Sequence, residues 1–434
     1  MPLNPLLRER LDSLSISEGD EIRIRTPLAE YKGLLMPHHA FSGDNVVVLK
    51  LRSGYNVGVA VSPDTEITLL RKGEPVTRPS PERMPQPASL PHVAFIGTGG
   101  TIASFVDYRT GGVLPALNAH EIEMRVPEIS GICSLEGGTL FSVFSENMFC
   151  REWAAIAMEA ASRLNDGAHG VIIAHGTDTM AYTASALAFM LGRLSGPVVL
   201  TGAQRSPDRP SFDGYLNLIG SARIAGMSDI GEVTVVMHAD SSDKACHVHR
   251  GTRVRKMHSS RRDAFRSLNA PPIAIVDENI TYLSAYRRTE DVKVRADVSM
   301  SSDGTLITFF PGMSEKHFLA MTEGCRGIVL AGSGLGHVST DIISGIRKRV
   351  REGIPVVVTT QCLGGSVNMR VYSTGRDMIA AGAVEGGDML PEVAYVKLLW
   401  ALAHFEDMQQ ICDYMQSDIA GEISGRRFLG PLAD

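Results

Sequence analysis

Short stretches in which apolar and polar residues alternate fill the first seventy residues. One is Glu-Ile-Arg-Ile-Arg at residues 21–25, and others lie at 49–52, 58–61 and 66–70. Alternation places successive side chains on opposite faces, so each stretch predicts a half-buried β-strand. Four or five such strands predict a small all-β module over residues 1–73. Closure into an SH3-like β-barrel would leave no exposed sheet edge.

A proline-rich segment follows this module. Six of the eighteen residues at 74–91 are prolines, and few of the others are large and apolar. Proline fixes the backbone and favours extended chain, so the segment is predicted to be a semi-rigid linker.

Continuous apolar runs replace the alternation beyond the linker, for example at residues 92–97 and 170–175. Val- and Ile-rich runs are typical of strands buried on both faces of a parallel sheet, and amphipathic, helix-length segments lie between them. The pattern predicts an α/β core. A charged segment at 286–302 divides this core into a larger lobe at 92–285 and a smaller lobe at 303–434.

Composition narrows the class of protein. The 434 residues are 44% hydrophobic and carry a formal net charge of −6, which argues against disorder and against a global field that attracts nucleic acid. No apolar run reaches the ~18 residues of a membrane span, and the N-terminus has no apolar signal core. Six cysteines without a CxxC pair fit a reducing compartment. We therefore expect a cytoplasmic protein without a membrane partner.

The segments that follow the first two apolar runs are rich in glycine and hydroxyl groups. They read Thr-Gly-Gly-Thr at residues 98–101 and His-Gly-Thr-Asp-Thr at 175–179. Ligands bind beyond the carboxyl ends of parallel strands, so these segments are the first candidates for a site. Two nucleotide motifs are excluded: the chain has no Gly-Lys-Ser/Thr triplet, and Ile102 occupies the place of the third glycine in a dinucleotide fingerprint.

Thr101 is a glycine-flanked threonine at a predicted strand-to-helix turn. Taken alone, such a threonine is more often a turn cap than a nucleophile. A nucleophilic threonine needs a base that takes its proton. The chain offers three candidate bases: Tyr108, Asp178 and Lys256.

Two motifs together resemble the signatures of the bacterial-type L-asparaginase/glutaminase family. They are Thr-Gly-Gly-Thr-Ile-Ala at 98–103 and His-Gly-Thr-Asp-Thr at 175–179, about 75 residues apart. Residues 145–148, 202–205 and 254–256 extend the resemblance. It implies a two-lobe α/β fold with parallel sheets and an amidohydrolase activity.

The resemblance also implies roles for single residues. Thr101 corresponds to the threonine that attacks the side-chain amide. Thr177, Asp178 and Lys256 correspond to a second, threonine-centred triad. Which threonine forms the acyl bond stays open. The resemblance further implies three substrate-binding residues: Ser145, Glu146 and Tyr108.

Other segments look like a narrower branch of this family, the D subunits of archaeal glutamyl-tRNA(Gln) amidotransferases. These segments are residues 250–266, 332–337, 361–365 and 368–375, and the module at 1–73 has no place in a plain asparaginase. The resemblance implies a glutaminase that passes ammonia to a partner, the amidotransferase's E subunit. That partner would bind Glu-tRNA(Gln) and activate its glutamate with ATP and Mg²⁺, to form Gln-tRNA(Gln).

The same resemblance implies no cofactor or metal on this chain, and a homodimer of this subunit within a heterotetramer. Two alternatives remain. One is a stand-alone L-asparaginase/glutaminase. The other is a non-catalytic binding module, which is disfavoured because all four candidate catalytic residues are present together.

Three further features have competing interpretations. Residues 249–266 hold seven Lys or Arg and one acid, which fits intramolecular salt bridges or a solvated face better than contact with RNA. Cys246, His247 and His249 invite a zinc hypothesis, but ligands this close rarely surround one tetrahedral ion. His175 at a strand end is expected to be a packed, hydrogen-bonded histidine rather than a general base.

Overall fold

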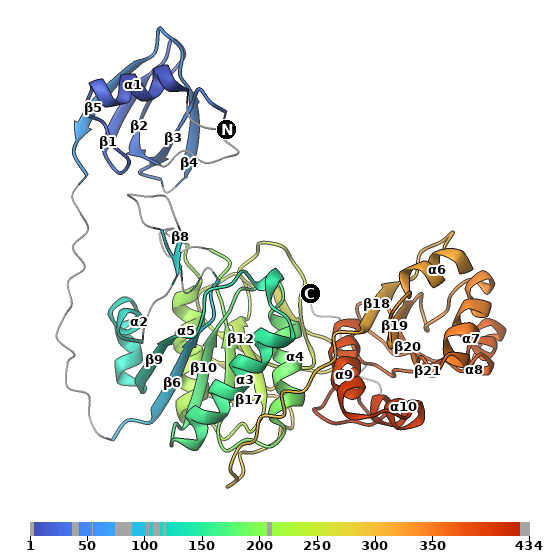
Figure 1. Cartoon of the computed structure of the whole chain (residues 1–434). Coiled ribbons are helices and arrows are strands. Elements are labelled where there is room, and N and C mark those ends of the chain that lie inside the picture. The colour runs from blue at the N-terminus through green and yellow to red at the C-terminus, as the bar shows by residue number, and fades with distance from the viewer. Residues whose placement is uncertain are drawn as a thin grey trace. The chain divides into compact units, whose positions relative to one another are not determined.

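The computed structural model describes residues 4–36, 43–53, 55–73, 89–100, 102, 104–106, 113–115, 119–205 and 211–425. The chain divides into two compact units, one built around the N-terminal module and the other holding the α/β core (Figure 1). The prediction of a linker at 74–91 falls mostly outside the described residues.

The N-terminal module contains an antiparallel five-stranded sheet in the order β4-β3-β2-β1-β5. Its strands are β1 (Glu21–Arg25), β2 (Glu30–Leu35), β3 (Val46–Leu51), β4 (Asn56–Ala60) and β5 (Glu66–Arg71). Alternate side chains such as Ile22, Ile24 and Leu49 are fully buried, as the alternating pattern predicts. The module is β-barrel-like, and the predicted strands are confirmed.

The expectation that this module is all-β is wrong, because helix α1 spans Pro5–Ser13. Asn4 caps it by accepting a hydrogen bond from the Leu6 amide at 3.0 Å, and Pro5 occupies the first turn, where no backbone donor is needed. Leu7 and Leu11, four residues apart, lie on one helix face and are buried in the module's core.

The larger lobe is built on an eight-stranded sheet in the order β17-β16-β13-β12-β11-β10-β6-β9. Five strands are parallel: β9 (Ser134–Thr139), β6 (His92–Gly97), β10 (Gly170–Ala174), β11 (Val198–Thr201) and β12 (Val233–His238). Three more extend the sheet antiparallel: β13 (Cys246–Arg250), β16 (Ala274–Val276) and β17 (Ile280–Tyr282). The apolar runs predict four of the parallel strands, but neither β9 nor these three antiparallel strands.

Helices cover both faces of this sheet. Val171 and Ile173 face α3 and α4, whereas Val236 lies against Gly220 of α5. The helices of this lobe are α2 (Ala119–Arg125), α3 (Cys150–Asn165), α4 (Met180–Leu191) and α5 (Gly214–Met227), with 3-10 turns at Pro127–Gly131 and Ser145–Asn147. Two short hairpins complete the described chain up to the smaller lobe: β7 (Ser104–Val106) with β8 (Val113–Pro115), and β14 (Val254–Lys256) with β15 (Phe265–Ser267).

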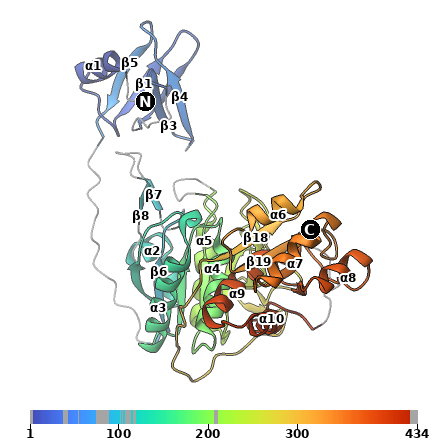
Figure 2. The same ribbon diagram turned by 45° about the vertical axis from the view of Figure 1, so that its right-hand side comes forward.

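The smaller lobe has a parallel four-stranded sheet in the order β18-β19-β20-β21. Its elements are β18 (Gly304–Thr308), α6 (Glu315–Met321), β19 (Gly327–Gly332), a 3-10 turn (Thr340–Ile342), α7 (Ile343–Arg351), β20 (Val356–Thr360), α8 (Ser373–Ala380), β21 (Val384–Glu385), α9 (Pro391–His404) and α10 (Met408–Gln416). Helix α9 begins at Pro391, since proline is tolerated in the first turn of a helix. It packs against α4 of the larger lobe and against β18 and β19 of its own, so it joins the two lobes (Figure 2).

Among the described residues, no helix has the length and apolar character needed to cross a membrane.

Candidate active site

Glycines let the segments after β6 and β10 meet backbone to backbone. Gly99 and Gly100 have φ angles of +112° and +82°, which side-chain-bearing residues rarely adopt. A Cβ on Gly100 would lie 2.5 Å from the Gly176 amide nitrogen, and one on Gly99 would lie 2.6 Å from the Val143 carbonyl oxygen. The Thr-Gly-Gly motif therefore brings three loops to one edge of the sheet.

The first predicted nucleophile follows Gly100 directly in the sequence. Thr101 and the loop tyrosine, Tyr108, both lie outside the described residues. Their roles stay predictions.

Three of the four predicted catalytic residues lie together. Lys256 Nζ donates to Thr177 Oγ1 at 2.9 Å and to Asp178 Oδ1 at 2.8 Å. Thr177 and Asp178 follow β10, whereas Lys256 ends β14, so the fold joins segments that are far apart in sequence. The Lys256 side chain is 12% exposed and that of Asp178 is 70% exposed. The cluster thus opens to solvent through the aspartate.

A third loop approaches Thr177 from β11. The Thr177 hydroxyl lies 3.5 Å from Gln204 Oε1. The backbone amide of Gln204 donates to the buried carboxylate of Asp213 at 2.9 Å. Gly202 allows this approach, because a Cβ there would meet Thr177 Cγ2 at 2.8 Å. Residues 202–205 were recognisable as a motif, but the motif gave Gln204 no role.

The predicted substrate loop lies beside the second signature. Ser145 is buried, its carbonyl accepts a hydrogen bond from Thr179 Oγ1 at 2.6 Å, and a Cβ on Gly176 would meet its own Cβ at 2.8 Å. Glu146 is exposed on the same 3-10 turn. The structure therefore brings Ser145 to the Thr177 loop and leaves Glu146 accessible to a small molecule.

This arrangement can activate a hydroxyl. Helix α4 begins three residues after Thr177, so its N-terminal amides and dipole favour negative charge near that hydroxyl. Lys256, as an ammonium, uses two of its protons on Thr177 and Asp178. It must release a proton before its amine can accept the hydroxyl proton.

His175 has the surroundings of a structural residue, as expected. It is fully buried, and its Nδ1 lies 2.6 Å from the Gly176 carbonyl. Burial lowers the pKa of this imidazole to about 4. The ring is therefore neutral at neutral pH.

All seven basic residues of the 249–266 segment form ion pairs within the chain. The pairs are Arg250 with Glu232, Arg253 with Asp388, Arg255 with Glu392, Lys256 with Asp178, Arg262 with Asp243, and both Arg261 and Arg266 with Asp263. This agrees with the interpretation of intramolecular salt bridges.

The smaller lobe holds the strand that carries Lys256. Arg253, only 1% exposed, pairs with Asp388 at 2.9 Å, and Arg255 pairs with Glu392 of α9 at 2.7 Å. Sequence reasoning missed Asp388 and Glu392, because no motif or spacing connects them with a segment some 135 residues earlier.

The zinc hypothesis finds no support in the described part of the chain, where no three His, Cys, Asp or Glu side chains form a metal-binding group. Cys246 and His247 are neighbours in β13, and successive residues of a strand point to opposite faces.

This two-lobe α/β fold, with its Thr177, Asp178 and Lys256 cluster, defines an asparaginase-type amidohydrolase. Family models match the chain as "Asparaginase, N-terminal" at residues 92–288 and "Glutaminase/Asparaginase C-terminal domain" at 305–415. A solved L-asparaginase from Thermococcus kodakarensis is 32% identical, with a TM-score of 0.70, covering 77% of this chain and 100% of its own. L-asparaginase I from Vibrio cholerae is 28% identical, with a TM-score of 0.68 and the same coverage.

The N-terminal part has its own match, to the "GatD N-terminal domain" at residues 16–70. The D subunit of the glutamyl-tRNA(Gln) amidotransferase of Pyrococcus furiosus is 46% identical over 429 residues, 96% of this chain and 97% of that protein. That of Saccharolobus islandicus is 44% identical over 426 residues, 96% and 95% of the two chains. The chain belongs to the family of glutamyl-tRNA(Gln) amidotransferase D subunits.

Proposed function

We propose that this chain is the glutaminase subunit of a tRNA-dependent amidotransferase. It releases ammonia from the side-chain amide of glutamine, and a partner subunit uses that ammonia to convert Glu-tRNA(Gln) to Gln-tRNA(Gln). One observation carries the proposal: relatives named as amidotransferase D subunits align with 96% of the chain, whereas the solved L-asparaginases align with 77% of it. A stand-alone asparaginase leaves the N-terminal module without a role.

The chemistry follows from the threonine hydroxyls. Thr177 Oγ1 attacks the amide carbon and passes its proton to the neutral Lys256 amine 2.9 Å away. The carbon–nitrogen bond breaks, the lysine ammonium protonates the leaving nitrogen, and ammonia departs. Water then hydrolyses the acyl ester to glutamate and regenerates the hydroxyl. Thr101 is the other candidate for the attacking residue.

The substrate groups that do not react need their own partners. Glutamine carries an ammonium and a carboxylate at its α-carbon. Ser145 and Glu146 on the turn beside Gly176 are suited to hold them, and Tyr108 is the third candidate. Asp178, with its side chain 70% exposed, can accept from the substrate ammonium as well as from Lys256.

The partner in this proposal is the E subunit of the amidotransferase. It binds the misacylated tRNA and uses ATP and Mg²⁺, whereas this chain needs no cofactor of its own for the hydrolysis. Two copies of the chain pair as a homodimer within a heterotetramer. A tRNA substrate fits a complex that works in the cytoplasm.

The test measures both halves of the reaction with the full-length chain, the partner subunit, ATP, Mg²⁺ and Glu-tRNA(Gln). We expect glutamine-dependent formation of Gln-tRNA(Gln), with one ammonia released per glutamate formed. Lys256→Met should lower the rate of this reaction by about 10²–10⁴-fold, whereas Lys316→Met, at an exposed position on α6, should leave the rate unchanged. Rapid asparagine hydrolysis by the chain alone, without transfer to tRNA, would establish the stand-alone asparaginase instead.

A further inference from the structure

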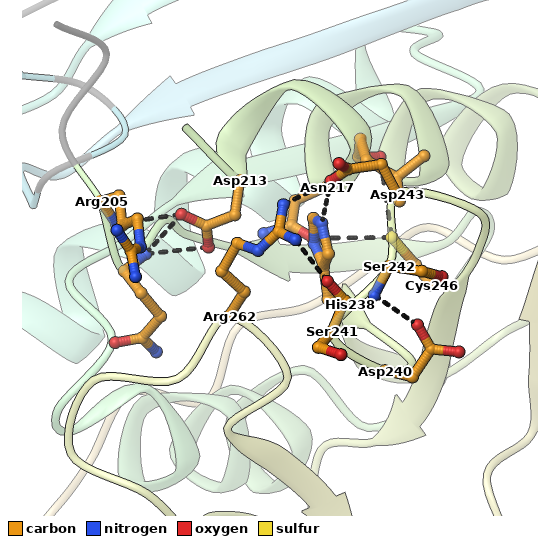
Figure 3. A network of polar contacts seen from close by, with 12 residues as sticks. Arg205, Asp213, Asn217, His238, Asp240, Ser241, Ser242, Asp243, Cys246 and Arg262 are labelled. Atoms are coloured by element: carbon orange, nitrogen blue, oxygen red, sulfur yellow. Dashed lines mark hydrogen bonds and ion pairs between the residues drawn. The ribbon is translucent and has the colours of Figure 1, made fainter. Parts of the chain in front are cut away.

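A polar network that includes Asp213, Asn217, His238, Asp243 and Arg262 lies between the Gln204 loop and the hairpin that carries Lys256 (Figure 3). Its centre is His238, the last residue of β12, which is fully buried. His238 Nδ1 lies 2.6 Å from Asn217 Oδ1, and its Nε2 lies 3.3 Å from Asp243 Oδ1. The ring therefore touches helix α5 on one side and the β12–β13 turn on the other.

The α5 side of the network ends at the Gln204 loop. Asn217 Nδ2 donates to the Gly202 carbonyl at 2.9 Å, which fixes the orientation of this amide and makes His238 Nδ1 the donor to its oxygen. The Asp243 carboxylate is also an acceptor, so the contact with Asp243 requires a proton on Nε2 as well, in the imidazolium form of the ring. Asp213, the residue that precedes α5, accepts from the Gln204 amide. This loop carries the Gln204 side chain that contacts Thr177.

The other side ends at the turn that follows Lys256. Arg262 NH1 pairs with Asp243 Oδ1 at 2.5 Å, and its NH2 donates to the Ser241 carbonyl. Arg262 lies six residues after Lys256, between β14 and β15. The contact between Lys256 and Thr177 closes a ring of interactions that passes through His238.

We propose that His238 is a positioning residue for the amide hydrolysis: through Asn217 and Asp243 it holds the Gln204 loop and the Lys256 hairpin at a fixed separation. The inference rests on the proposed function. It follows from the chemistry, because hydroxyl activation requires Lys256 Nζ within hydrogen-bond distance of Thr177, and a misplacement of about 1 Å can cost 10²-fold in rate. Asp213, Asn217 and His238 are all fully buried, so water does not readily replace a lost contact on the Asn217 side, whereas the Asp243 side chain at the other end is 69% exposed.

Two substitutions of His238 each remove a different one of its two contacts, with Asn217 or with Asp243. His238→Asn keeps a donor near the Nδ1 position and so retains the Asn217 arm, whereas His238→Gln reaches the Nε2 position and retains the Asp243 arm. His238→Ala loses both. The matched control is His92→Ala, which removes a half-exposed imidazole–carboxylate pair with Glu136 at the opposite end of the parallel strands.

Hydrogen exchange in the full-length chain tests this closed set of contacts without a measurement of enzyme activity. We expect faster exchange at residues 202–205 in His238→Gln, at 257–264 in His238→Asn, and in both segments in His238→Ala. The His92→Ala variant should exchange like the wild type in both. Unchanged exchange in both segments of His238→Ala would overturn the proposal, even if the melting temperature falls.

Kinetics in the complete reaction supply the second readout. His238→Ala should lower kcat for ammonia release by about 10- to 100-fold and change KM by less than about threefold. Arg262→Gln should act through the same ring, so the double variant should lose little more than the worse single variant. If the fold-losses in kcat of the two single variants multiply in the double variant, His238 and Arg262 act independently, and the proposed link between them is refuted. Failure of the wild-type complex to release ammonia would count against the proposed function, and the exchange result would still decide this inference.

Discussion

Lys256 Nζ lies 2.9 Å from Thr177 Oγ1, although 79 residues separate the two positions. The contact exists because β10 and the β14–β15 hairpin belong to one lobe, and because Arg253 and Arg255 bind that hairpin to the smaller lobe. The geometry of the hydroxyl and its base thus depends on both lobes.

Replacement of Lys256 tests its role as proton acceptor. Lys256→Met fills a similar volume without an amine, and we expect glutaminase activity to fall by about 10²–10⁴-fold, as for a lost general base. The measurement is steady-state ammonia release. Circular dichroism should show an unchanged fold, and near-normal turnover in a folded variant would remove Lys256 from the mechanism.

The two threonines can be separated by trapping. Thr177→Val and Thr101→Val each delete one hydroxyl, and only the residue that forms the ester should carry an acyl adduct in the intact protein. Mass spectrometry of acid-quenched reactions locates that adduct by peptide. The serine variants keep the hydroxyl and serve as controls. An adduct on neither residue would contradict covalent catalysis by these threonines.

The Arg253–Asp388 pair should matter more for stability than its distance from the substrate suggests. Arg253 is 1% exposed, so Arg253→Met leaves the Asp388 carboxylate buried and unpaired. Loss of one partner of a buried pair typically costs about 3–5 kcal/mol, and we expect a decrease of that order in the free energy of unfolding.

Urea denaturation of the full chain measures this effect. Arg25→Met breaks an exposed pair with Glu30 and should change stability little. The double variant Arg253→Met, Asp388→Leu should recover part of the loss, because it removes the stranded charge. Equal effects of Arg253→Met and Arg25→Met would contradict this account.

Much of the fold could be predicted from residue patterns, because a buried strand or helix face requires apolar residues at regular positions along a short segment. The runs at β6, β10 and β12 are dominated by apolar residues, as strands between two helical layers must be. Helix α1 escaped because its signal, Asn4 and Pro5 before two leucines, is a capping signal rather than an alternation. β16 and β17 have three residues each, too few for any period.

The site divides in the same way. Thr177 and Asp178 sit in a motif, so a resemblance finds them. His238 and Asn217 are single polar residues on elements whose sequence pattern is that of core, and only the fold shows that they contact each other. A fully buried polar residue at a strand end is a signal in the structure, but burial of a single residue is not written in its sequence neighbours.

Acid should destabilise the protein well above the range in which carboxylates titrate. Burial lowers the pKa of His175 from 6.5 to about 4, and burial, with His247 and Arg266 nearby, lowers that of His249 well below its usual value. Between about pH 6.5 and pH 4 the unfolded chain binds more protons than the folded chain. The free energy of unfolding therefore falls as the pH drops through this range. At about 1.4 kcal/mol per pKa unit, His175 alone accounts for a loss of roughly 3 kcal/mol in the free energy of unfolding over this pH range.

Urea unfolding at about pH 7.5, 6 and 5 measures this loss. His175→Asn removes one titrating group and should give a shallower dependence on pH, whatever its own effect on stability. A free energy of unfolding that stays constant across this range would show that these imidazoles titrate normally.

Activation by the partner distinguishes an ammonia donor from a free hydrolase. A donor that hydrolysed glutamine without an acceptor would waste it, so its site should be completed by interactions that exist only in the assembled complex. The Lys256 hairpin is the described element best placed to respond, since its position sets the contact with Thr177 and it is tied to the network through His238.

We therefore expect weak glutamine hydrolysis by the isolated chain and an increase of at least tenfold, about 1.4 kcal/mol of barrier, when the E subunit and Glu-tRNA(Gln) are added. Ammonia release with glutamine and with asparagine, in the presence and absence of each addition, measures it. Uncharged tRNA is the control that separates assembly from the presence of an acceptor. Because the activation acts through the site's geometry, it should raise kcat more than it lowers KM for glutamine; full activity of the chain alone would contradict a site completed by its partner.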